Sequence, residues 1–240
     1  MIKADLHVHT VLSPCGDIEM TPAFIIRRAK ESGLGIIGIT DHNSTLQCLE
    51  TKRIGEREGV FVICGAEITT KEEVHVLAFV EGEEKLEKLQ NYLSGHLPKI
   101  LNNAGFFGYQ LVVNEKEEIL SEEVYLLISA IDQTIEQTEK FVHSLGGIFI
   151  PAHIDKRQNS LLSQLGFLPP GLKIDALELK KQTDVNMFIS QNDYLKKYNF
   201  IKSSDAHFPG DFGEIYTELD IESPSFFAIK EALISNGITV

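Results

Sequence analysis

The segment "DLHVHT" (Asp5 to Thr10) lies in the first short apolar run of this 240-residue chain and carries two histidines one residue apart. Side chains alternate between the two faces of a strand, so His7 and His9 should share one face with Asp5, about 6–7 Å apart along the strand. Two imidazoles on one face can hold a cation, and a nearby carboxylate can fix their tautomers. The segment by itself fits this reading and equally an ordinary pair of histidines, so the rest of the sequence has to decide.

The composition is that of an ordinary soluble globular protein with an acidic balance. The chain has 22 basic and 35 acidic side chains, a net charge of -13, and no block of lysines or arginines. Such a balance repels nucleic acid and anionic membranes, so nucleic acid is an unlikely partner and no membrane partner is expected. The three cysteines, Cys15, Cys48 and Cys64, have no zinc-finger or redox spacing and indicate reduced thiols. No apolar run approaches the ~20 residues of a membrane span, and the N-terminus is no signal peptide, so we expect a cytoplasmic protein.

Apolar runs alternate with helical patterns along most of the chain. The runs that we predict as further strands are Leu34 to Thr40, Val60 to Thr69, Val74 to Val80, Gly147 to Ile154, Ile174 to Leu179 and Phe200 to Ser204. "TPAFIIRRAKESG" predicts a helix with Thr21 as N-cap, Pro22 at its first position and Gly33 as its stop. The last helix should repeat this pattern with Ser223, Pro224 and Gly237.

This alternation favours an α/β fold with a parallel sheet. About seven strand and helix units over this length predict a closed or nearly closed barrel, with an open doubly wound sheet as the alternative. Residues 81 to about 145 break the rhythm: an acidic helix, a loop with a hairpin, and helices around 121–145 are expected there. We interpret this segment as an elaboration on one barrel domain over residues 1–240.

Side chains that can bind a metal follow the apolar runs at several places. His7 and His9 end the first apolar run, and His75 lies inside a later one. The candidates that follow the later runs are Asp41, His42, Glu67, His153, Asp155, Asp205 and His207. The carboxyl ends of the strands of a parallel barrel converge on one face, so these side chains should meet in one pocket. Imidazole and carboxylate ligands without thiolates suit zinc, manganese or iron.

These motifs, in this order, resemble the PHP (polymerase and histidinol phosphatase) family of metal-dependent phosphoesterases. "DLHVHT" is similar to its first motif, "TDHN" to its second, "GAEIT" to its third, and "AHI" with "SSDAH" to its last. The resemblance covers nearly the whole chain in five separated blocks. It implies a distorted (β/α)7, TIM-like barrel with two or three divalent transition-metal ions (Zn, Mn or Fe) at the ends of the strands.

The resemblance also implies a set of ligands. One ion would take His7, His9, Glu67 and Asp205; a second would share Glu67 and take His75 and His153; a third would take His42, His207 and one residue from the loop after the first strand. Relatives carry a histidine there, or an aspartate at a fixed distance before a Thr-Pro pair. Counting back from Thr21 and Pro22 favours Asp17, with Cys15 as the competing ligand. Asp5 and Asp41 would hold histidines in place.

The function implied is hydrolysis of a small phosphorylated metabolite or nucleotide by attack of a metal-bound hydroxide on phosphorus. Glu67, Asp205 and His207 would be catalytic, and Arg157, Lys180 and Lys181 are the candidates for binding the substrate's phosphate. Monoester and diester substrates both remain open, and oligomeric state has no sequence signal. The alternatives are a metal-binding regulatory module without turnover and a 3′–5′ exonuclease.

Overall fold

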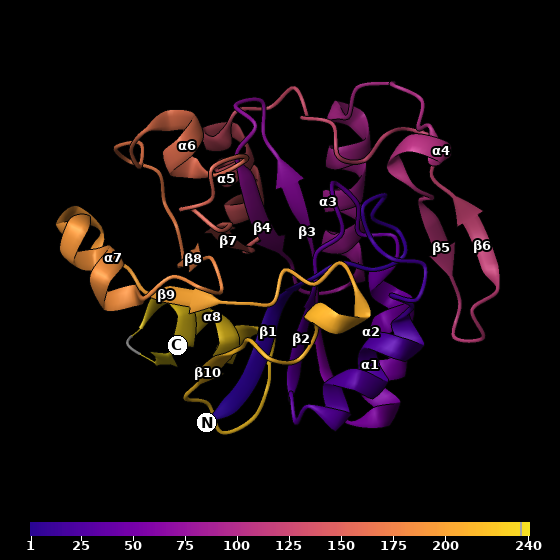
Figure 1. Cartoon of the computed structure of the whole chain (residues 1–240), viewed down its shortest axis with the longest axis horizontal. Coiled ribbons are helices and arrows are strands. Elements are labelled where there is room, and N and C mark those ends of the chain that lie inside the picture. The colour runs from indigo at the N-terminus through magenta and orange to yellow at the C-terminus, as the bar shows by residue number, and fades with distance from the viewer. Residues whose placement is uncertain (236) are drawn as a thin grey trace.

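The computed structural model describes residues 1–235 and 237–240 and shows an α/β fold around a strongly curled sheet (Figure 1). The strands are β1 (Ile2–Val8), β2 (Ile36–Ile39), β3 (Phe61–Thr69), β4 (His75–Phe79), β5 (Leu111–Val113), β6 (Ile119–Glu122), β7 (Ile148–Pro151), β8 (Leu177–Leu179), β9 (Phe200–Lys202), β10 (Thr217–Leu219) and β11 (Ile238–Thr239). The α-helices are α1 (Pro22–Glu31), α2 (Cys48–Glu58), α3 (Glu83–His96), α4 (Ala104–Phe107), α5 (Ile135–Ser144), α6 (Leu161–Leu165), α7 (Val185–Gln191) and α8 (Phe226–Ile234). None of these helices is both long and apolar enough to cross a membrane.

The strands form a distorted barrel, as the sequence predicts. Seven of them make one sheet in the order β11-β10-β1-β2-β3-β4-β7, and the parallel pair β8-β9 lies between its two ends. On one side of this pair, Asp175 N–H donates to Phe149 C=O (3.0 Å) beside β7. On the other side, His9 N–H donates to Ala206 C=O (3.0 Å) beside β1. These hydrogen bonds bring the carboxyl ends of β1, β3, β7 and β9 to one mouth.

The sheet is mixed, which corrects the expectation of a parallel one. β1, β2 and β3 run parallel, but β4 is antiparallel to both β3 and β7. A short turn joins β3 to β4, and a turn of that length allows only a hairpin, since a parallel connection needs a dozen or more residues. The register pairs Thr69 with His75. A histidine at the start of β4 therefore lies at the same end of the barrel as the last residues of β3.

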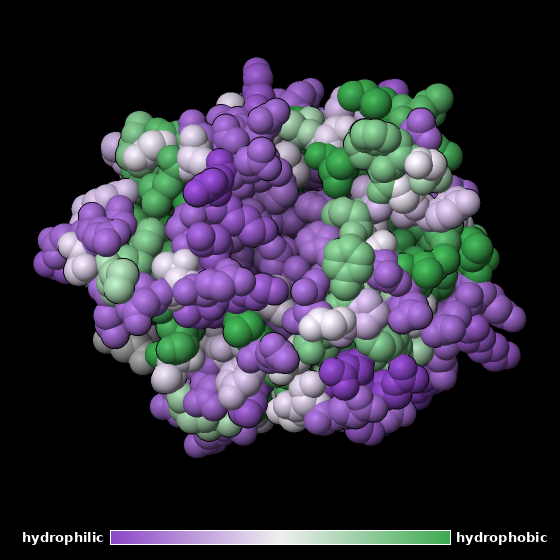
Figure 2. Space-filling model, viewed as in Figure 1, coloured by the Kyte–Doolittle hydropathy of each residue, from purple (hydrophilic) through white to green (hydrophobic). Residues whose placement is uncertain are grey.

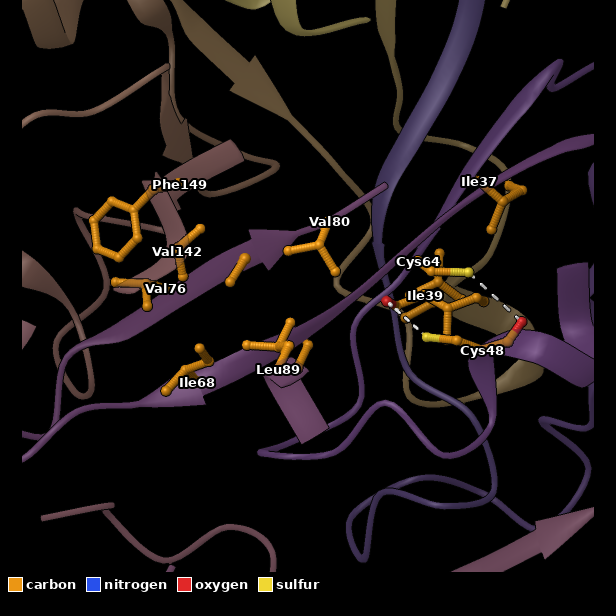
Figure 3. Packing of buried hydrophobic residues seen from close by; sticks show 14 of the residues in the cluster. Ile37, Ile39, Cys48, Cys64, Ile68, Val76, Val80, Leu89, Val142 and Phe149 are labelled. Atoms are coloured by element: carbon orange, nitrogen blue, oxygen red, sulfur yellow. Dashed lines mark hydrogen bonds between the residues drawn. The ribbon is translucent and has the colours of Figure 1, made fainter. Parts of the chain in front are cut away.

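Alternation along β3 separates the barrel interior from the layer under the helices. Ile63 belongs to an inner cluster with Leu77 and Phe79, which α8 covers with Phe226. Glu67 is four residues after Ile63, so its side chain projects to the same side. Cys64 projects to the other side and packs with Cys48 of α2 and Ile39 of β2, as Figure 3 shows. The core thus holds Glu67 in the barrel interior.

The first helix begins where the sequence predicts, and the last one begins later. The Thr21 hydroxyl accepts the Phe24 N–H, with Pro22 in the first helical position. α8 is capped by Ser225, whose hydroxyl accepts the Ala228 N–H, two residues after the predicted Ser223. A Ser-Pro pair and a nearby second serine offer two possible caps, and packing of the apolar helix face selects between them.

The segment around 81–145 contains the predicted acidic helix, α3, and a hairpin of β5 and β6. The prediction of helices over 121–145 is correct only for α5, since residues 119–122 are a strand and 123–134 are mostly turns and loop. The hairpin is tied to the barrel by the Gln47 side chain, which donates to Val113 C=O and accepts the Val113 N–H, both at 2.8 Å. The amide of Gln47 thus makes the same two hydrogen bonds with Val113 that a neighbouring strand would make. No sequence pattern predicts this contact.

Helix α5 is fastened to the strands by one imidazole. His143 donates through Nδ1 to Glu139 (2.6 Å) and through Nε2 to Asp175 (3.0 Å), and Asp175 also accepts the Phe149 N–H (2.7 Å). The hydrogen bond to Asp175 has the largest effect on the pKa of His143 and raises it above the ordinary 6.5. The hydrogen bond to Glu139 raises this pKa further. Both ring nitrogens donate only in the protonated form.

We therefore predict a stability contribution that depends on pH. Because the pKa of His143 is higher in the folded chain than in the unfolded one, its contribution is fully present below the unfolded value and is lost as the pH rises through the folded value. Replacement His143→Gln should lower the free energy of unfolding by roughly 1 kcal/mol more at about pH 6 than at about pH 9. Denaturant unfolding at both pH values measures this. His96→Gln, which removes an exposed pair with Asp132, is the control and should show little difference; an equal loss at both pH values for His143→Gln would contradict the assignment.

Candidate metal centre

The carboxylate of Glu67 lies at the centre of a buried cluster of histidines. Its Oε1 is 2.8 Å from His75 Nδ1, 3.0 Å from His153 Nε2 and 3.3 Å from His7 Nε2. Its Oε2 is 3.2 Å from His42 Nδ1 and 3.3 Å from His9 Nε2. Both oxygens thus face imidazoles from four different strands or their following loops. The prediction that these side chains converge is met by the geometry.

One group has the spacing of a metal coordination sphere. His7 Nε2 and His9 Nε2 are 3.2 Å apart, and Asp205 Oδ1 is 3.3 Å from the first and 3.6 Å from the second. Glu67 adds one oxygen beside each histidine, with Oε1 3.3 Å from His7 Nε2 and Oε2 3.3 Å from His9 Nε2. Ligand atoms about 2.0–2.1 Å from a tetrahedral ion are separated by roughly 3.3–3.4 Å, so the two ring nitrogens and Asp205 Oδ1 have the spacing of ligands to one ion, and the Glu67 carboxylate lies beside them.

His42 and His207 form a second group with His9. The ligand atoms of the three lie within 4.8 Å of one another, as do those of His42, Glu67 and His75. The rings of His9 and His207 are stacked, with centroids 4.0 Å apart. The grouping differs from the predicted one in that His9 belongs to both groups, because its ring stacks on His207 of the loop after β9.

Neither candidate for the last ligand joins the three histidines. The carboxylate of Asp17 instead accepts the Glu19 N–H (2.8 Å) within its own loop, although Asp17 N–H donates to His207 C=O (2.8 Å). The turn thus uses the Asp17 carboxylate locally, and the structure does not bring it to the three histidines. Cys15 is exposed on the same loop. Desolvation and then the negative charge of Glu67 raise the pKa of its thiol to about 12.

Several supporting contacts fix which ring nitrogen faces the cluster. His7 Nδ1 donates to Glu178 Oε2 (2.9 Å), which leaves Nε2 toward Glu67 and Asp205. His9 Nδ1 donates to Ser13 Oγ (2.9 Å), whose own hydrogen goes to Asp41 Oδ1 (2.7 Å). His207 Nδ1 is 3.0 Å from Asp205 C=O. The imidazole tautomers are thus set by hydrogen bonds on the far side of each ring.

The predicted role of Asp5 and Asp41 in holding histidines is carried out indirectly. Asp41 acts on His9 through Ser13 and also accepts the Thr10 N–H (2.7 Å). Asp5 accepts the Ser204 N–H (3.0 Å) and lies 3.4 Å from the His7 N–H. It joins the backbone of β1 to the loop that carries Asp205. Its burial raises its pKa to about 7.

The charge in this cluster is strongly coupled. Burial by itself would raise the pKa of Glu67, but the imidazoles of His75, His7 and His42 outweigh it and hold that pKa well below its ordinary value. Burial opposes protonation of His7, yet the carboxylates of Glu178, Glu67 and Asp205 raise its pKa well above 6.5. The cluster therefore favours positive charge between its carboxylates, which is the charge that a divalent cation brings.

Two of the residues are held in a backbone conformation that is uncommon outside glycine. His153 has a φ of 29° and Asp205 a φ of 51°. Histidine and aspartate adopt positive φ more often than most side chains do, at a cost of about 1–3 kcal/mol each. Both residues follow strands, β7 and β9, and the turn directs their side chains at the barrel axis. The fold tolerates this conformation where the cluster is built.

The residues present fit a metal centre on several independent grounds. The spacing of the first group is that of an ion's ligands, and the ring nitrogens are oriented from behind. Among the described residues, the buried Glu67 Oε2 and His42 Nδ1 lie 3.2 Å apart without the geometry of a hydrogen bond, and neither has another hydrogen-bond partner. Buried polar atoms of native proteins are nearly always satisfied, so these two indicate a bound group.

A pocket adjoins this cluster at the ends of β7, β8 and β9. It has a volume of about 250 Å³ and is lined by His153, Lys156, Glu178, Leu179, Lys180, Lys181, Gln182, Ser203, Ser204 and Asp205. Figure 2 shows hydrophilic residues around a hollow in the middle of this face. Lys180 and Lys181 lie where the sequence predicts. Arg157 is exposed and does not line the pocket, which corrects that prediction, since the turn after β7 directs Lys156 inward instead.

Three contributors to the site were missed from the sequence. Glu178 is a carboxylate within the apolar run "ALEL", and a charge buried in a strand was a usable signal. Lys156, whose ammonium pairs with Asp205 Oδ2, and Ser13 carry no such signal. Their roles depend on loop conformations that only the folded chain fixes.

The chain resembles several known proteins over nearly its whole length. It is 27% identical to the uncharacterized protein YqxK of Bacillus subtilis, over 97% of this chain and 62% of that protein. The lesion-specific endonuclease PfuEndoQ from Pyrococcus furiosus superposes with a TM-score of 0.73 at 19% identity, covering 97% of this chain and 56% of that one. The chain thus spans less than two thirds of both. A proposed metal-dependent phosphoesterase from Bifidobacterium adolescentis superposes with a TM-score of 0.58 at 19% identity, over 96% and 95% of the two chains.

At these identities the superpositions show a shared fold. The model of the PHP domain matches residues 5–149, which contain the first strand with its two histidines, Glu67 and His75. The match covers more than half of the chain and includes the hairpin between β4 and β7. This chain belongs to the PHP domain family.

Proposed function

We propose that this chain is a metal-dependent phosphoesterase that hydrolyses a small phosphorylated metabolite or nucleotide. The observation that carries the proposal is a buried mouth in which His7 Nε2, His9 Nε2 and Asp205 Oδ1 lie 3.2–3.6 Å apart, with one Glu67 oxygen 3.3 Å from each histidine. A lysine-lined pocket beside these residues suits an anionic substrate. The kinship with PHP proteins agrees with this chemistry.

The cations would be held by three overlapping groups. His7, His9, Glu67 and Asp205 would form the first; Glu67, His75 and His153 the second; His42 and His207, with His9 at their border, the third. Divalent ions in such groups lower the pKa of bound water and neutralise the charge of a phosphate ester. Glu67 belongs to two groups. Its Oε1 faces His7, His75 and His153, and its Oε2 faces His9 and His42.

The remaining residues keep the ligands in their working state. Glu178 holds the proton on His7 Nδ1, and the Ser13–Asp41 pair holds the proton on His9 Nδ1, so the Nε2 lone pairs point inward. Lys156 pairs with Asp205 Oδ2, which leaves Oδ1 directed at the two histidines. These contacts preorganise the mouth without moving during the reaction.

His207 lies at the rim of the cluster. Its side chain is 20% exposed, whereas the histidines beneath it are almost fully buried. Desolvation and then the neighbouring His9 charge lower its pKa to about 4, so the ring is neutral at physiological pH. A neutral imidazole is the form that holds a cation, and at the rim that cation would meet the substrate's phosphate.

The alternative functions differ in charge requirement and in turnover. PfuEndoQ is a lesion-specific endonuclease of similar fold, but the net charge of -13 of this chain opposes binding of extended nucleic acid. A regulatory module would bind metal without hydrolysing esters. A panel of phosphomonoesters, diesters, cyclic phosphates, single-stranded DNA and duplex DNA separates these possibilities.

The first prediction concerns the shared carboxylate. Glu67→Gln keeps the side-chain volume but removes the charge that balances the cations, so turnover of the best substrate in the panel should fall by at least about a thousandfold. Steady-state kinetics measures this, with circular dichroism to verify the fold. Glu139→Gln, a buried glutamate paired with His143 outside the site, is the matched control. Undiminished turnover in Glu67→Gln would exclude the proposed role.

The second prediction concerns metal content. Protein purified without chelator should contain two to three equivalents of zinc, manganese or iron by elemental analysis, because the three ligand groups are built for separate ions. Dialysis against a chelator should abolish turnover, and added divalent ions should restore it. A metal-free preparation with full activity would refute the proposal.

The third prediction concerns the carboxylate behind His7. Glu178→Gln weakens the hydrogen bond that orients His7 and should lower metal affinity by about 10- to 100-fold. Competition with a chromogenic chelator measures this affinity directly. Glu218→Gln on β10, outside the cluster, serves as the comparison and should retain the original affinity. Equal affinities for the two variants would show that Glu178 is not an orienting partner.

A further inference from the structure

The pocket beside the metal centre is built from three loops that follow neighbouring strands. Lys156 follows β7, Lys180 and Lys181 follow β8, and Ser203 follows β9. One wall of the pocket consists of the cluster residues His153, Glu178 and Asp205, so whatever fills it touches the metal centre. The pocket is therefore a side chamber of the site.

The loops that carry the lysines are tied together before any ligand binds. Asp155 accepts the Lys180 N–H (2.9 Å) and the Thr183 hydroxyl. These bonds use both carboxylate oxygens and connect the turn after β7 to the turn after β8. Preorganised loops lower the entropic cost of binding.

Two of the lysine ammonium groups are not engaged in close ion pairs. Lys180 Nζ is 4.0 Å from Asp155, and Lys181 Nζ is 3.6 Å from Asp211, both longer than the ~2.7–2.9 Å of a charge-assisted hydrogen bond. Each of these side chains is 39% exposed. Lys156, by contrast, is held against Asp205. Lys180 and Lys181 are thus free to close on an anion.

A buried hydroxyl in the same pocket also lacks a partner. Ser203 is 3% exposed, and its Oγ has no hydrogen-bond partner within the described part of the chain. A hydroxyl can donate to an anionic oxygen, and nearly all buried polar side chains are satisfied in native proteins. Ser204 Oγ and Glu178 Oε1 line the same pocket and also lack partners among the described residues. These unpaired atoms are independent of the lysines and indicate a polar ligand, and the two lysines favour an anionic one.

We propose that this pocket binds a second anionic group of the substrate, a phosphate or a carboxylate carried by the alcohol that leaves. This inference rests on the proposed phosphoesterase function and narrows its substrate class to compact esters with two anionic groups. The scissile phosphate lies over the metal ligands, and the second anion is held by Lys180 and Lys181. A volume of about 250 Å³ admits a short substituent and excludes an extended chain.

The experiment compares three esters of one carbon skeleton: glycerol phosphate, phosphoglycerate and glycerol bisphosphate. The kcat/KM values for the two esters with a second anion should exceed that for glycerol phosphate by about tenfold or more, because each charged contact is worth about that factor. The ratio of phosphoglycerate to bisphosphate distinguishes a carboxylate from a phosphate pocket. A double substitution, Lys180→Ala with Lys181→Ala, should reduce the preference to about one.

A neighbouring exposed pair gives a matched control. Lys196→Ala with Lys197→Ala removes the same charge outside the pocket and should preserve the preference. Turnover with no preference, or a preference that both double variants share, overturns the inference while the proposed function stands. If none of these three esters is hydrolysed, calorimetric titration of glycerol bisphosphate into Glu67→Gln decides the pocket, and the wider ester panel decides the proposed function. Loss of Lys180 and Lys181 in that background should weaken binding at least tenfold, and unchanged binding would refute the assignment.

Discussion

The structure depends on one buried carboxylate that has to be balanced by positive charge. Glu67 is 1% exposed and projects into the barrel from the end of β3, where water cannot solvate it. An isolated charge in such a position is very costly. Five histidines contact its two oxygens, and further carboxylates lie behind them, so the cluster favours cations at its centre. This requirement connects the barrel fold to metal binding and, through it, to the chemistry that we propose.

The mixed sheet is what allows the cluster to form around Glu67. If β4 ran parallel to β3, the start of β4 would lie at the opposite end of the barrel and His75 with it. The hairpin reverses the chain and places His75 beside Thr69. β7, antiparallel to β4, then regains the direction of β3 and delivers His153 to the same mouth. One antiparallel strand thus places His75, at the start of β4, beside ligands that follow the carboxyl ends of the other strands.

The division between the metal centre and the lysine pocket has a physical basis. The cluster consists of nearly dry side chains whose tautomers are fixed from behind, whereas Lys180 and Lys181 are partly exposed and loosely paired. Rigid ligands suit ions that demand fixed distances, and mobile ammonium groups suit anions of varying shape. In the proposed enzyme, the metal cluster therefore determines the type of reaction, and the loop with Lys180 and Lys181 determines which substrates bind. Lys156 lies at the boundary, because its ammonium pairs with the ligand Asp205.

The sequence alone determined the barrel, seven of its strands and the family, because apolar periodicity and the spacing of histidines and carboxylates are local patterns. The sequence also named nine ligand candidates, and the fold brings eight of them to one mouth; Asp17 is the exception. The reversal at β4 could also have been predicted, because the gap between the runs Val60 to Thr69 and Val74 to Val80 is too short for a parallel connection. Only tertiary structure decided the place of Glu178 behind His7 and the choice of Lys156 over Arg157. These two features depend on the conformation of turns and on partners distant in the chain, and neither leaves a periodic pattern in the sequence. Local patterns fix which residues can act, and the closed barrel fixes which of them meet.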